Sequence, residues 1–193
     1  MSGLRVFIAI EFPAEARAAI LSQTASMRRA LPDSLVRWVA EENLHLTLKF
    51  LGDVPPGRVD AITAALTKSA AAQTGFAMQL EGVGSFPTPK RPRLIWAGIH
   101  APQGLAALQS GVDSAMARLG FPAEERPFSP HLTIGRVRQP VSPSDLTALR
   151  AAVEQAEAGE PIQVGVEAVH LFKSDLRAGG SIYTKLFSAP LKS

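Results

Sequence analysis

The sequence predicts a single α+β domain of two similar lobes, covering residues 1–193. Three observations support this fold class. Segments with strand and helix patterns alternate along the chain, their order recurs in the second half, and 193 residues with 46% hydrophobic content suffice for one domain with a sizeable core. The two His-x-Thr motifs begin at His45 and His131, 86 residues apart, and the helix-opening prolines Pro13 and Pro102 are 89 residues apart. We therefore expect approximate two-fold symmetry between the lobes.

The first half predicts strands that are apolar or alternating and helices that are Ala-rich and open at proline. In order, we expect a strand over 4–10, a helix over 13–31, strands over 36–39 and 44–51, a helix over 56–72, and one or two strands over 76–86. Within 44–51 the period-two pattern puts Phe50 in phase with Leu46 and Leu48, which indicates core packing. The same pattern puts Lys49 on the face of His45.

The second half repeats this order and ends in a strand-rich tail. We expect a strand over 94–99, a helix over 102–119, a strand over 131–137, a helix over 143–156, and tail strands over 162–191. A change of apolar phase at Glu167-Ala168 predicts a bulge or break. Gly179-Gly180 predicts a turn, after which 182–187 should pair back antiparallel.

Composition narrows the class of protein. With 20 basic and 17 acidic residues the net charge is +3, which permits an anionic partner without requiring one. The absence of cysteine excludes disulfides, thiolate metal sites and a cysteine nucleophile. The N-terminal segment lacks the pattern of a signal peptide, and no apolar stretch reaches the roughly 20 residues of a membrane span. We expect a cytoplasmic protein with no membrane association.

The His-x-Thr motifs are the candidate chemical centre. Residues i and i+2 of a strand face the same way, so His45 projects beside Thr47, and His131 beside Thr133. If the two strands lie near a pseudo-two-fold axis, the pairs can hold opposite sides of a phosphodiester. One histidine would then act as base and the other as acid, while the hydroxyls bind the non-bridging oxygens.

Alternative interpretations remain open for several of these residues. Either histidine alone could be a polar strand residue, and a zinc site lacks companion ligands at suitable spacing. Arg136 lies five positions after its histidine, which places it on the opposite face unless the strand changes near Gly135. Phe50 could stack on a base or pack in the core. His100 and His170 have no threonine partner and are expected to be structural or surface residues.

The motifs resemble those of the two-histidine phosphoesterase superfamily, and within it the bacterial and archaeal RNA 2′,3′-cyclic phosphodiesterases, long called 2′-5′ RNA ligases. The resemblance rests on segments distributed over nearly the whole chain. They are Phe-Ile-Ala-Ile at 7–10, Asn-Leu-His-Leu-Thr-Leu-Lys-Phe-Leu-Gly at 43–52, Leu-Ile-Trp-Ala-Gly at 94–98, Phe-Ser-Pro-His-Leu-Thr-Ile-Gly-Arg at 128–136, and the tail residues Leu171, Ser174, Leu176 and Tyr183.

The resemblance implies a bilobal α+β fold in which a pseudo-two-fold pair of antiparallel sheets lines a central cleft, with helices packed on the outer faces. It also implies hydrolysis of RNA 2′,3′-cyclic phosphate ends, tRNA fragments included, to 2′-phosphomonoesters without a metal or other cofactor. His45 would be the proton donor and His131 the proton acceptor. Thr47, Thr133, Arg136 and Phe50 would contact the substrate of a monomeric enzyme.

Other functions are compatible with the sequence. The chain could be a non-catalytic RNA or nucleotide-binding module, or it could act on a small cyclic nucleotide or a 2′-5′ oligoadenylate. Replacement of either histidine by alanine separates a catalyst from a binding module, because only a catalyst loses turnover with little loss of binding. In some members of the family the same chemistry joins RNA ends through a 2′-5′ linkage.

Overall fold

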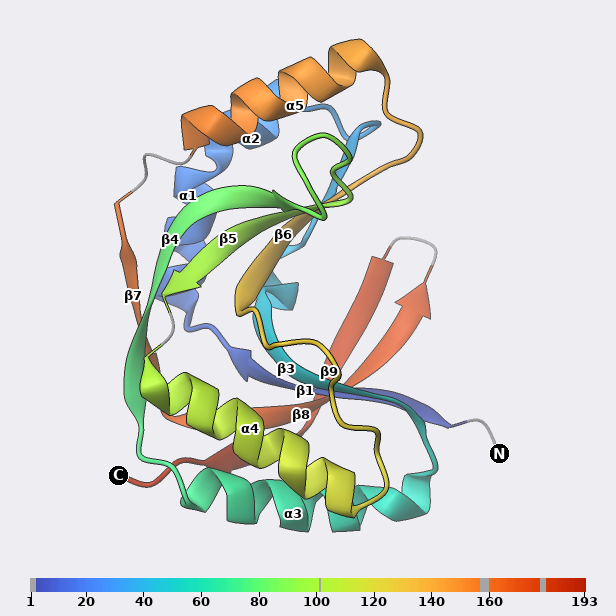
Figure 1. Ribbon diagram of the computed structural model, residues 1–193, viewed down its shortest axis with the longest axis vertical. Coiled ribbons are helices and arrows are strands. Elements are labelled where there is room, and N and C mark those ends of the chain that lie inside the picture. Colours follow the sequence, from blue (N-terminus) through green and yellow to red (C-terminus); the bar gives the residue numbers. More distant parts are fainter. Residues whose placement is uncertain (1–2, 101, 157–159, 178–179) are drawn as a thin grey trace.

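The computed structural model describes residues 3–100, 102–156, 160–177 and 180–193 and contains two antiparallel sheets (Figure 1). The side of each sheet that carries the histidine of its His-x-Thr motif is called its cleft side. The first sheet has the strand order β3-β1-β8-β9 and the second β2-β6-β5-β4-β7. The strands are β1 (Leu4–Glu11), β2 (Val36–Trp38), β3 (His45–Val54), β4 (Phe76–Phe86), β5 (Leu94–His100), β6 (His131–Val137), β7 (Ile162–Val166), β8 (Ala168–Arg177) and β9 (Gly180–Pro190). The α+β architecture expected from the sequence is confirmed.

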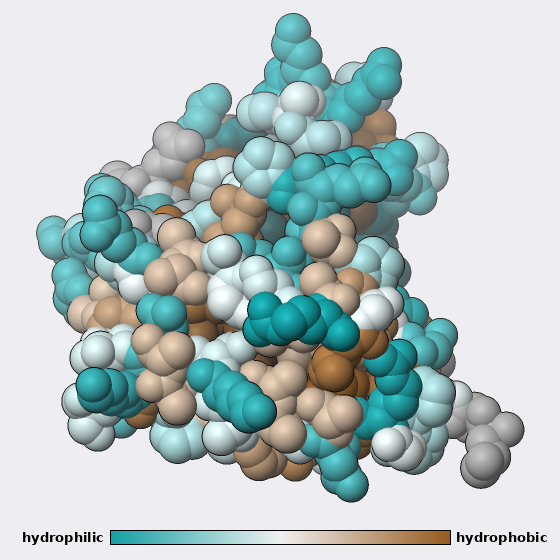
Figure 2. All heavy atoms as spheres, turned by 60° about the horizontal axis from the view of Figure 1, so that its bottom comes forward, coloured by the Kyte–Doolittle hydropathy of each residue, from teal (hydrophilic) through white to brown (hydrophobic). Residues whose placement is uncertain are grey.

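Helices cover the outer faces of both sheets. They are α1 (Ala14–Gln23), α2 (Ala25–Ala30), α3 (Val59–Ala71), α4 (Gln103–Arg118) and α5 (Pro143–Ala156), with short 3-10 helices η1 (Glu41–Asn43) and η2 (Pro56–Arg58). The pair α3 and α4 packs beside the first sheet, and α1, α2 and α5 beside the second (Figure 1). The face on which α3 and α4 come forward mixes hydrophilic and hydrophobic side chains (Figure 2). Among the described residues, no helix is both long and apolar enough to span a bilayer.

The lobes are not the two halves of the chain. Helix α1 follows β1 in sequence but contacts β7 of the other sheet, and α4 follows β5 but contacts β3. The tail strands β8 and β9 complete the first sheet, where β8 pairs with β1. The chain therefore passes repeatedly between the lobes.

The predicted elements agree with the structure in order and nearly in extent. The expected helix over 13–31 is divided at Thr24, which ends α1 and precedes α2, and whose hydroxyl donates to the carbonyl of Ile20 at 2.7 Å. The segment 76–86 forms one strand, and Glu167 separates β7 from β8, as the phase change predicted. The turn predicted at Gly179-Gly180 lies partly outside the described residues, but Arg177 pairs with Gly180 and the two strands are antiparallel.

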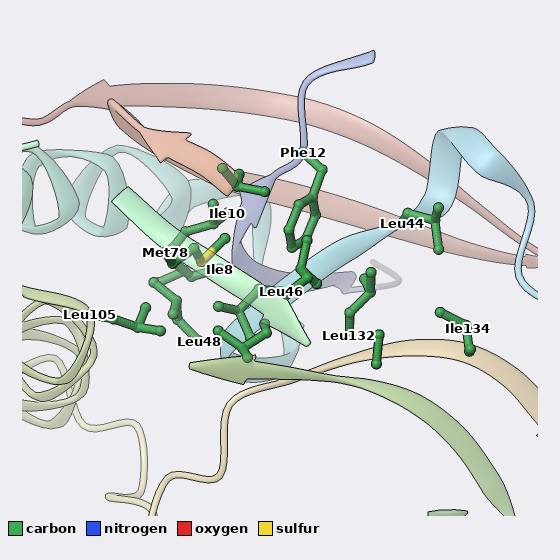
Figure 3. Close-up of a cluster of buried hydrophobic side chains, with 14 of the residues drawn as sticks. Ile8, Ile10, Phe12, Leu44, Leu46, Leu48, Met78, Leu105, Leu132 and Ile134 are labelled. Atoms are coloured by element: carbon green, nitrogen blue, oxygen red, sulfur yellow. The ribbon is translucent and has the colours of Figure 1, made fainter. Parts of the chain in front are cut away.

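A continuous buried cluster joins the two motif strands. Leu46 and Leu48 of β3 and Leu132 and Ile134 of β6 belong to this main core, and each is at most 3% exposed (Figure 3). At roughly 1.5–3 kcal/mol for each fully buried side chain of this size, such contacts fix the motif strands firmly. The alternate residues, including both histidines, consequently point away from the main core.

The cleft side of the first sheet has its own small buried cluster. Phe7, Ala9 and Phe172 form it, with Tyr183 packed against them, separate from the main core on the other face. Phe7 and Phe172 are register partners on β1 and β8, and their rings stack with centroids 5.4 Å apart. This aromatic layer forms the floor of the cleft beside β3.

A bulge in β3 corrects the sequence-based placement of Phe50 and Lys49. On β1, Ile8 pairs with Lys49 and Ala9 pairs with Thr47, so Leu48 has no partner and the alternation of faces reverses after it. Lys49 is therefore buried on the core side. Phe50, expected in the core, is 64% exposed and lies with its ring centroid 5.9 Å from that of Phe7 on the cleft side.

Candidate active site

The two His-x-Thr strands lie next to each other at the centre of the molecule, although they belong to different sheets (Figure 1). His45 and Thr47 project from β3, and His131 and Thr133 from β6, each pair on the face opposite the buried leucines. All four side chains are half-buried. Two imidazoles and two hydroxyls are thus presented from equivalent positions of adjacent strands.

The two imidazoles are held in the same way. Nδ1 of His45 lies 2.7 Å from the carbonyl oxygen of Asn43, and Nδ1 of His131 lies 2.8 Å from that of Ser129. A carbonyl oxygen can only accept, so each Nδ1 carries a proton and donates it. Nε2 is therefore the nitrogen that gains or loses a proton on each ring, and its position relative to the motif is the same in both lobes.

A second bulge brings Arg136 to the cleft. On β5, Ile95 pairs with Gly135 and Trp96 pairs with Thr133, so Ile134 of β6 has no partner. The strand continues to Val137, and the bulge returns Arg136, which is exposed, to the face of His131. The sequence left the face of Arg136 undecided, and the structure resolves it through Ile134.

Gly135 is required at this bulge by close packing. A Cβ there would lie 2.9 Å from a methyl carbon of Val36 and 3.0 Å from the ring of Trp38. Both side chains belong to β2, which pairs with β6. The glycine therefore lets β2 approach the bulged strand, where any larger residue would collide with these two side chains.

The surroundings of His45 lower its pKa below the usual value. Its ring lies against Phe7 and Tyr183, with centroids 4.9 and 5.1 Å away. Burial is the main cause of the lowered pKa, the hydrogen bond to Asn43 opposes it, and the positive charge of Arg136 adds to it. The last effect indicates that Arg136, from the second sheet, lies near enough to His45 of the first for their charges to interact.

Aromatic contact also positions His131. The ring of Phe86 on β4 meets it edge-on, with centroids 5.2 Å apart, and Phe86 in turn contacts Trp96 at 5.2 Å. Each histidine thus has an aromatic neighbour at nearly a right angle, Tyr183 for one and Phe86 for the other. The two lobes therefore resemble each other in their motifs and also in the aromatic side chains that contact the motif histidines.

A small pocket of about 120 Å³ opens beside His45, on the side of the tail hairpin. It is lined by Phe7, Glu11, Glu42, Leu44, His45, Phe172, Tyr183 and Lys185, with an ion pair between Glu11 and Lys185. Apart from His45, the sequence pattern did not assign these residues to the site. Phe172 and Tyr183 reach His45 only through the pairing of β1 with β8 and of β8 with β9, which no local pattern predicts.

Phe128 of the second motif segment and the two histidines without a threonine partner have other surroundings. Phe128 is partly buried against the main core, and His100 is exposed. His170 is buried, and its Nδ1 lies 2.9 Å from the hydroxyl of Ser188. Over the described parts of the chain, no three His, Cys, Asp or Glu side chains form a group that could hold a metal ion.

Lys49 links the first motif strand to the segment that leads into the second. Its Nζ donates to Asp113 of α4 at 2.5 Å and to the carbonyl oxygen of Pro122 at 2.7 Å. The Lys49 side chain is 1% exposed and that of Asp113 20%. This buried ion pair ties β3, α4 and the segment before His131 together.

Comparison with known proteins supports a common family. The model of the 2′-5′ RNA ligase superfamily matches residues 12–178. The RNA 2′,3′-cyclic phosphodiesterase of Methanothermobacter thermautotrophicus is 32% identical over 183 residues, 95% of this chain and 96% of its own length. That of Escherichia coli is 38% identical over 133 residues, 68% of this chain and 71% of its own.

Solved structures match over almost the entire chain. A protein of Thermus thermophilus has a TM-score of 0.79 and 28% identity, with 97% of this chain and 98% of its own covered. E. coli LigT complexed with 3′-AMP has a TM-score of 0.74 and 30% identity, with 99% of both chains covered. The same protein has been crystallised with phosphate.

Proposed function

The chain belongs to the 2′-5′ RNA ligase superfamily, and on that premise we propose that it hydrolyses the 2′,3′-cyclic phosphate at the end of an RNA strand to a 2′-phosphomonoester, without a metal ion. The observation that carries the proposal is the matched pair of histidines, each with Nδ1 bonded to a backbone carbonyl and Nε2 available for proton transfer. The names of the relatives, RNA 2′,3′-cyclic phosphodiesterases, support the substrate class.

In the proposed reaction His131 is the base and His45 the acid. Nε2 of His131 takes a proton from water as its oxygen attacks phosphorus, the bond from phosphorus to the 3′ oxygen breaks, and Nε2 of His45 gives its proton to that oxygen. The products are a 3′-hydroxyl and a 2′-phosphate. If an RNA 5′-hydroxyl attacks in place of water, the same displacement forms a 2′-5′ linkage.

The lowered pKa of His45 is compatible with this role. Burial and the charge of Arg136 make its imidazolium a stronger acid, which favours donation to the departing oxygen. The bound phosphate carries a negative charge next to Arg136, so it offsets the effect of Arg136 and favours protonation of His45 in the complex. His45 is then protonated in the complex, where it donates its proton to the departing 3′ oxygen.

The neighbouring groups supply substrate binding. We assign Thr47 and Thr133 to the non-bridging phosphate oxygens, since each hydroxyl is on the same strand face as its histidine. Arg136 adds a positive charge that can bind phosphate oxygens in a fork. Phe50, exposed on the cleft side, offers a ring on which the terminal base can stack.

The test is incubation with a short RNA ending in a 2′,3′-cyclic phosphate, in the presence of EDTA. The expected result is complete conversion to the 2′-phosphomonoester, identified by its phosphorus NMR signal. A 3′-phosphomonoester would assign the leaving oxygen to the 2′ position and contradict the proposed geometry. Unchanged RNA would refute the activity.

Histidine variants separate catalysis from binding. His45→Ala and His131→Ala should each reduce kcat by about 10²–10⁴-fold while the Kd for the 2′-phosphorylated product changes only a few-fold. Parallel assays with adenosine 2′,3′-cyclic phosphate and a 2′-5′ oligoadenylate would show whether RNA, a small cyclic nucleotide or an oligoadenylate is the preferred substrate. Loss of affinity without any turnover in the unaltered protein would identify a binding module.

A further inference from the structure

Arg37 is the neighbour of Arg136 on the cleft face of the second sheet. The two residues are register partners across β2 and β6, so their side chains leave the sheet on the same side. The residues that flank Arg37 face the other way. Val36 is fully buried in the main core, and Trp38 lies under the guanidinium of Arg28 from α2, 4.9 Å from the ring centroid.

The two arginines are close to each other, and neither belongs to an ion pair of the described residues. Antiparallel register partners have Cα atoms about 4.5–5.5 Å apart, and like charges in that relationship destabilise a sheet. The ion pairs of the described residues have as their cations Arg17, Lys49, Lys173 and Lys185. Both Arg37 and Arg136 are exposed. A bound anion would remove this repulsion.

The position of β2 indicates which anion would bind between the two arginines. β2 is the outermost strand on its side of the sheet, next to the motif strand β6. A line from the motif through Arg136 to Arg37 therefore leads from the reacting phosphate towards the rim of the cleft. A strand of RNA that extends from the site along this line carries its next negative charge one nucleoside away, on the 5′ oxygen of the terminal ribose.

We propose that Arg37 binds this 5′-side phosphate and makes the enzyme selective for cyclic phosphates that end a chain over free nucleoside cyclic phosphates. The inference rests on the proposed function, since it extends the same site by one phosphate. Arg suits this role because its planar fork can bind two oxygens of one phosphate. A small cyclic nucleotide without a 5′-phosphate leaves Arg37 without this contact.

Three substrates that differ at the 5′ oxygen of the terminal nucleoside test the proposal. They are adenosine 2′,3′-cyclic phosphate, the same compound with a 5′-phosphate, and the dinucleotide ApA ending in a 2′,3′-cyclic phosphate. In the unaltered enzyme we expect kcat/KM for the second and third to exceed that for the first by about tenfold, the scale of one charge-assisted hydrogen bond at an exposed site. The gain should reside mainly in KM and decrease as the salt concentration rises.

Substitutions then assign the gain to one residue. Arg37→Ala should bring the ratio between the 5′-phosphorylated and unphosphorylated substrates close to one, and Arg37→Lys should restore part of it. Arg29→Ala is the matched control, because Arg29 is an exposed arginine on the outer helix α2 and its loss removes the same charge. It should leave the ratio unaltered.

Failure of the proposed role of Arg37 can be distinguished from failure of the proposed function. If the unaltered enzyme cleaves none of the three substrates, the proposed function is wrong. If it cleaves all three equally, or if Arg37→Ala lowers kcat/KM for all three by the same factor, the function stands and the role of Arg37 is refuted. A ratio lowered as much by Arg29→Ala as by Arg37→Ala would also refute it, since the effect would then be that of net charge.

Discussion

Phe50 and Arg136 occupy equivalent positions of two bulged strands. Each follows its histidine by five residues, and each is returned to the cleft face because the residue after the motif threonine, Leu48 or Ile134, has no register partner. One lobe thus places an aromatic ring at this position and the other a guanidinium. The approximate symmetry of the backbone supports an asymmetric pair of side chains.

The exposure of Phe50 predicts a small effect of its loss on stability. Phe50→Ala should change the free energy of unfolding by less than about 0.5 kcal/mol, as for other surface substitutions. Leu48→Ala, two residues earlier and buried, should cost about 2–5 kcal/mol. Urea denaturation monitored by circular dichroism measures both. If Phe50→Ala lowered the free energy of unfolding by several kcal/mol, the ring of Phe50 would have to lie in the core, and the bulge at Leu48 would be contradicted.

The buried pair of Lys49 and Asp113 predicts unequal costs for its two members. Asp113→Asn leaves a buried charge without a counter-charge and should cost about 3–5 kcal/mol of unfolding free energy. Lys49→Met leaves a carboxylate that is partly exposed and should cost less. The double variant should be more stable than Asp113→Asn alone. Thermal and urea unfolding of the three variants test this order, and equal losses in both single variants would contradict it.

The lowered pKa of His45 can be measured directly. In an NMR titration without ligand, the ring proton of His45 should report a pKa below about 6.5, the usual value for histidine. Arg136→Gln removes one of the causes and should raise that pKa, whereas Arg29→Gln, on the outer surface, should leave it unaltered. No rise in Arg136→Gln would mean that Arg136 does not face His45.

The proposed acid and base predict a bell-shaped pH dependence of kcat/KM. The acidic limb reports the base, which must lose its proton, and the alkaline limb reports the acid, which must keep its own. Because the pKa of His45 is lowered, a smaller fraction of the free enzyme has His45 protonated while His131 is neutral, which reduces kcat/KM at a given pH. A rate that still rises above about pH 9 would exclude a histidine as the acid.

The buried His170 predicts that the fold loses stability in mild acid. Burial and the charge of Lys185 lower its pKa, and Glu11 opposes them. Between the unfolded pKa near 6.5 and the lower folded pKa, the unfolded chain binds more protons, so stability falls as the pH falls, by at most about 1.4 kcal/mol per pH unit for one proton. His45 acts in the same direction. His170→Gln should flatten the dependence of the unfolding midpoint on pH between about 7 and 5; an unchanged slope would show that His170 does not contribute.

The sequence predicted the elements and the motif pairs because both depend on local signals. Prolines open α1 and α4 in the structure as they do in the sequence pattern, and alternation correctly gave the faces of His45 and His131. The bulges left no such signal. A bulge that leaves one residue without a partner requires no particular amino acid, so the sequence does not reveal it. From the pattern alone, Phe50 faces the core together with Leu46 and Leu48.

Strand pairing is the other information that the sequence lacked. Tyr183 reaches His45 only because β8 and β9 join the N-terminal strand β1, and Arg37 neighbours Arg136 only because β2 pairs with β6. Both relationships join segments distant in the chain, and a local pattern does not choose between possible partners. The register of a pair is fixed by which faces are buried on both strands together.

The repeated passage of the chain between the lobes bears on how the cleft can move. A protein that closes on its ligand about one or two connecting segments can rotate its lobes freely, and binding then carries the cost of ordering them. Here α1 is anchored on one lobe and β1 on the other, and α4 and β5 are divided in the same way. Every such connection acts as a tether. Even a small rotation of one lobe therefore strains several tethers at once, so the enzyme should meet its substrate with a rigid, preassembled groove.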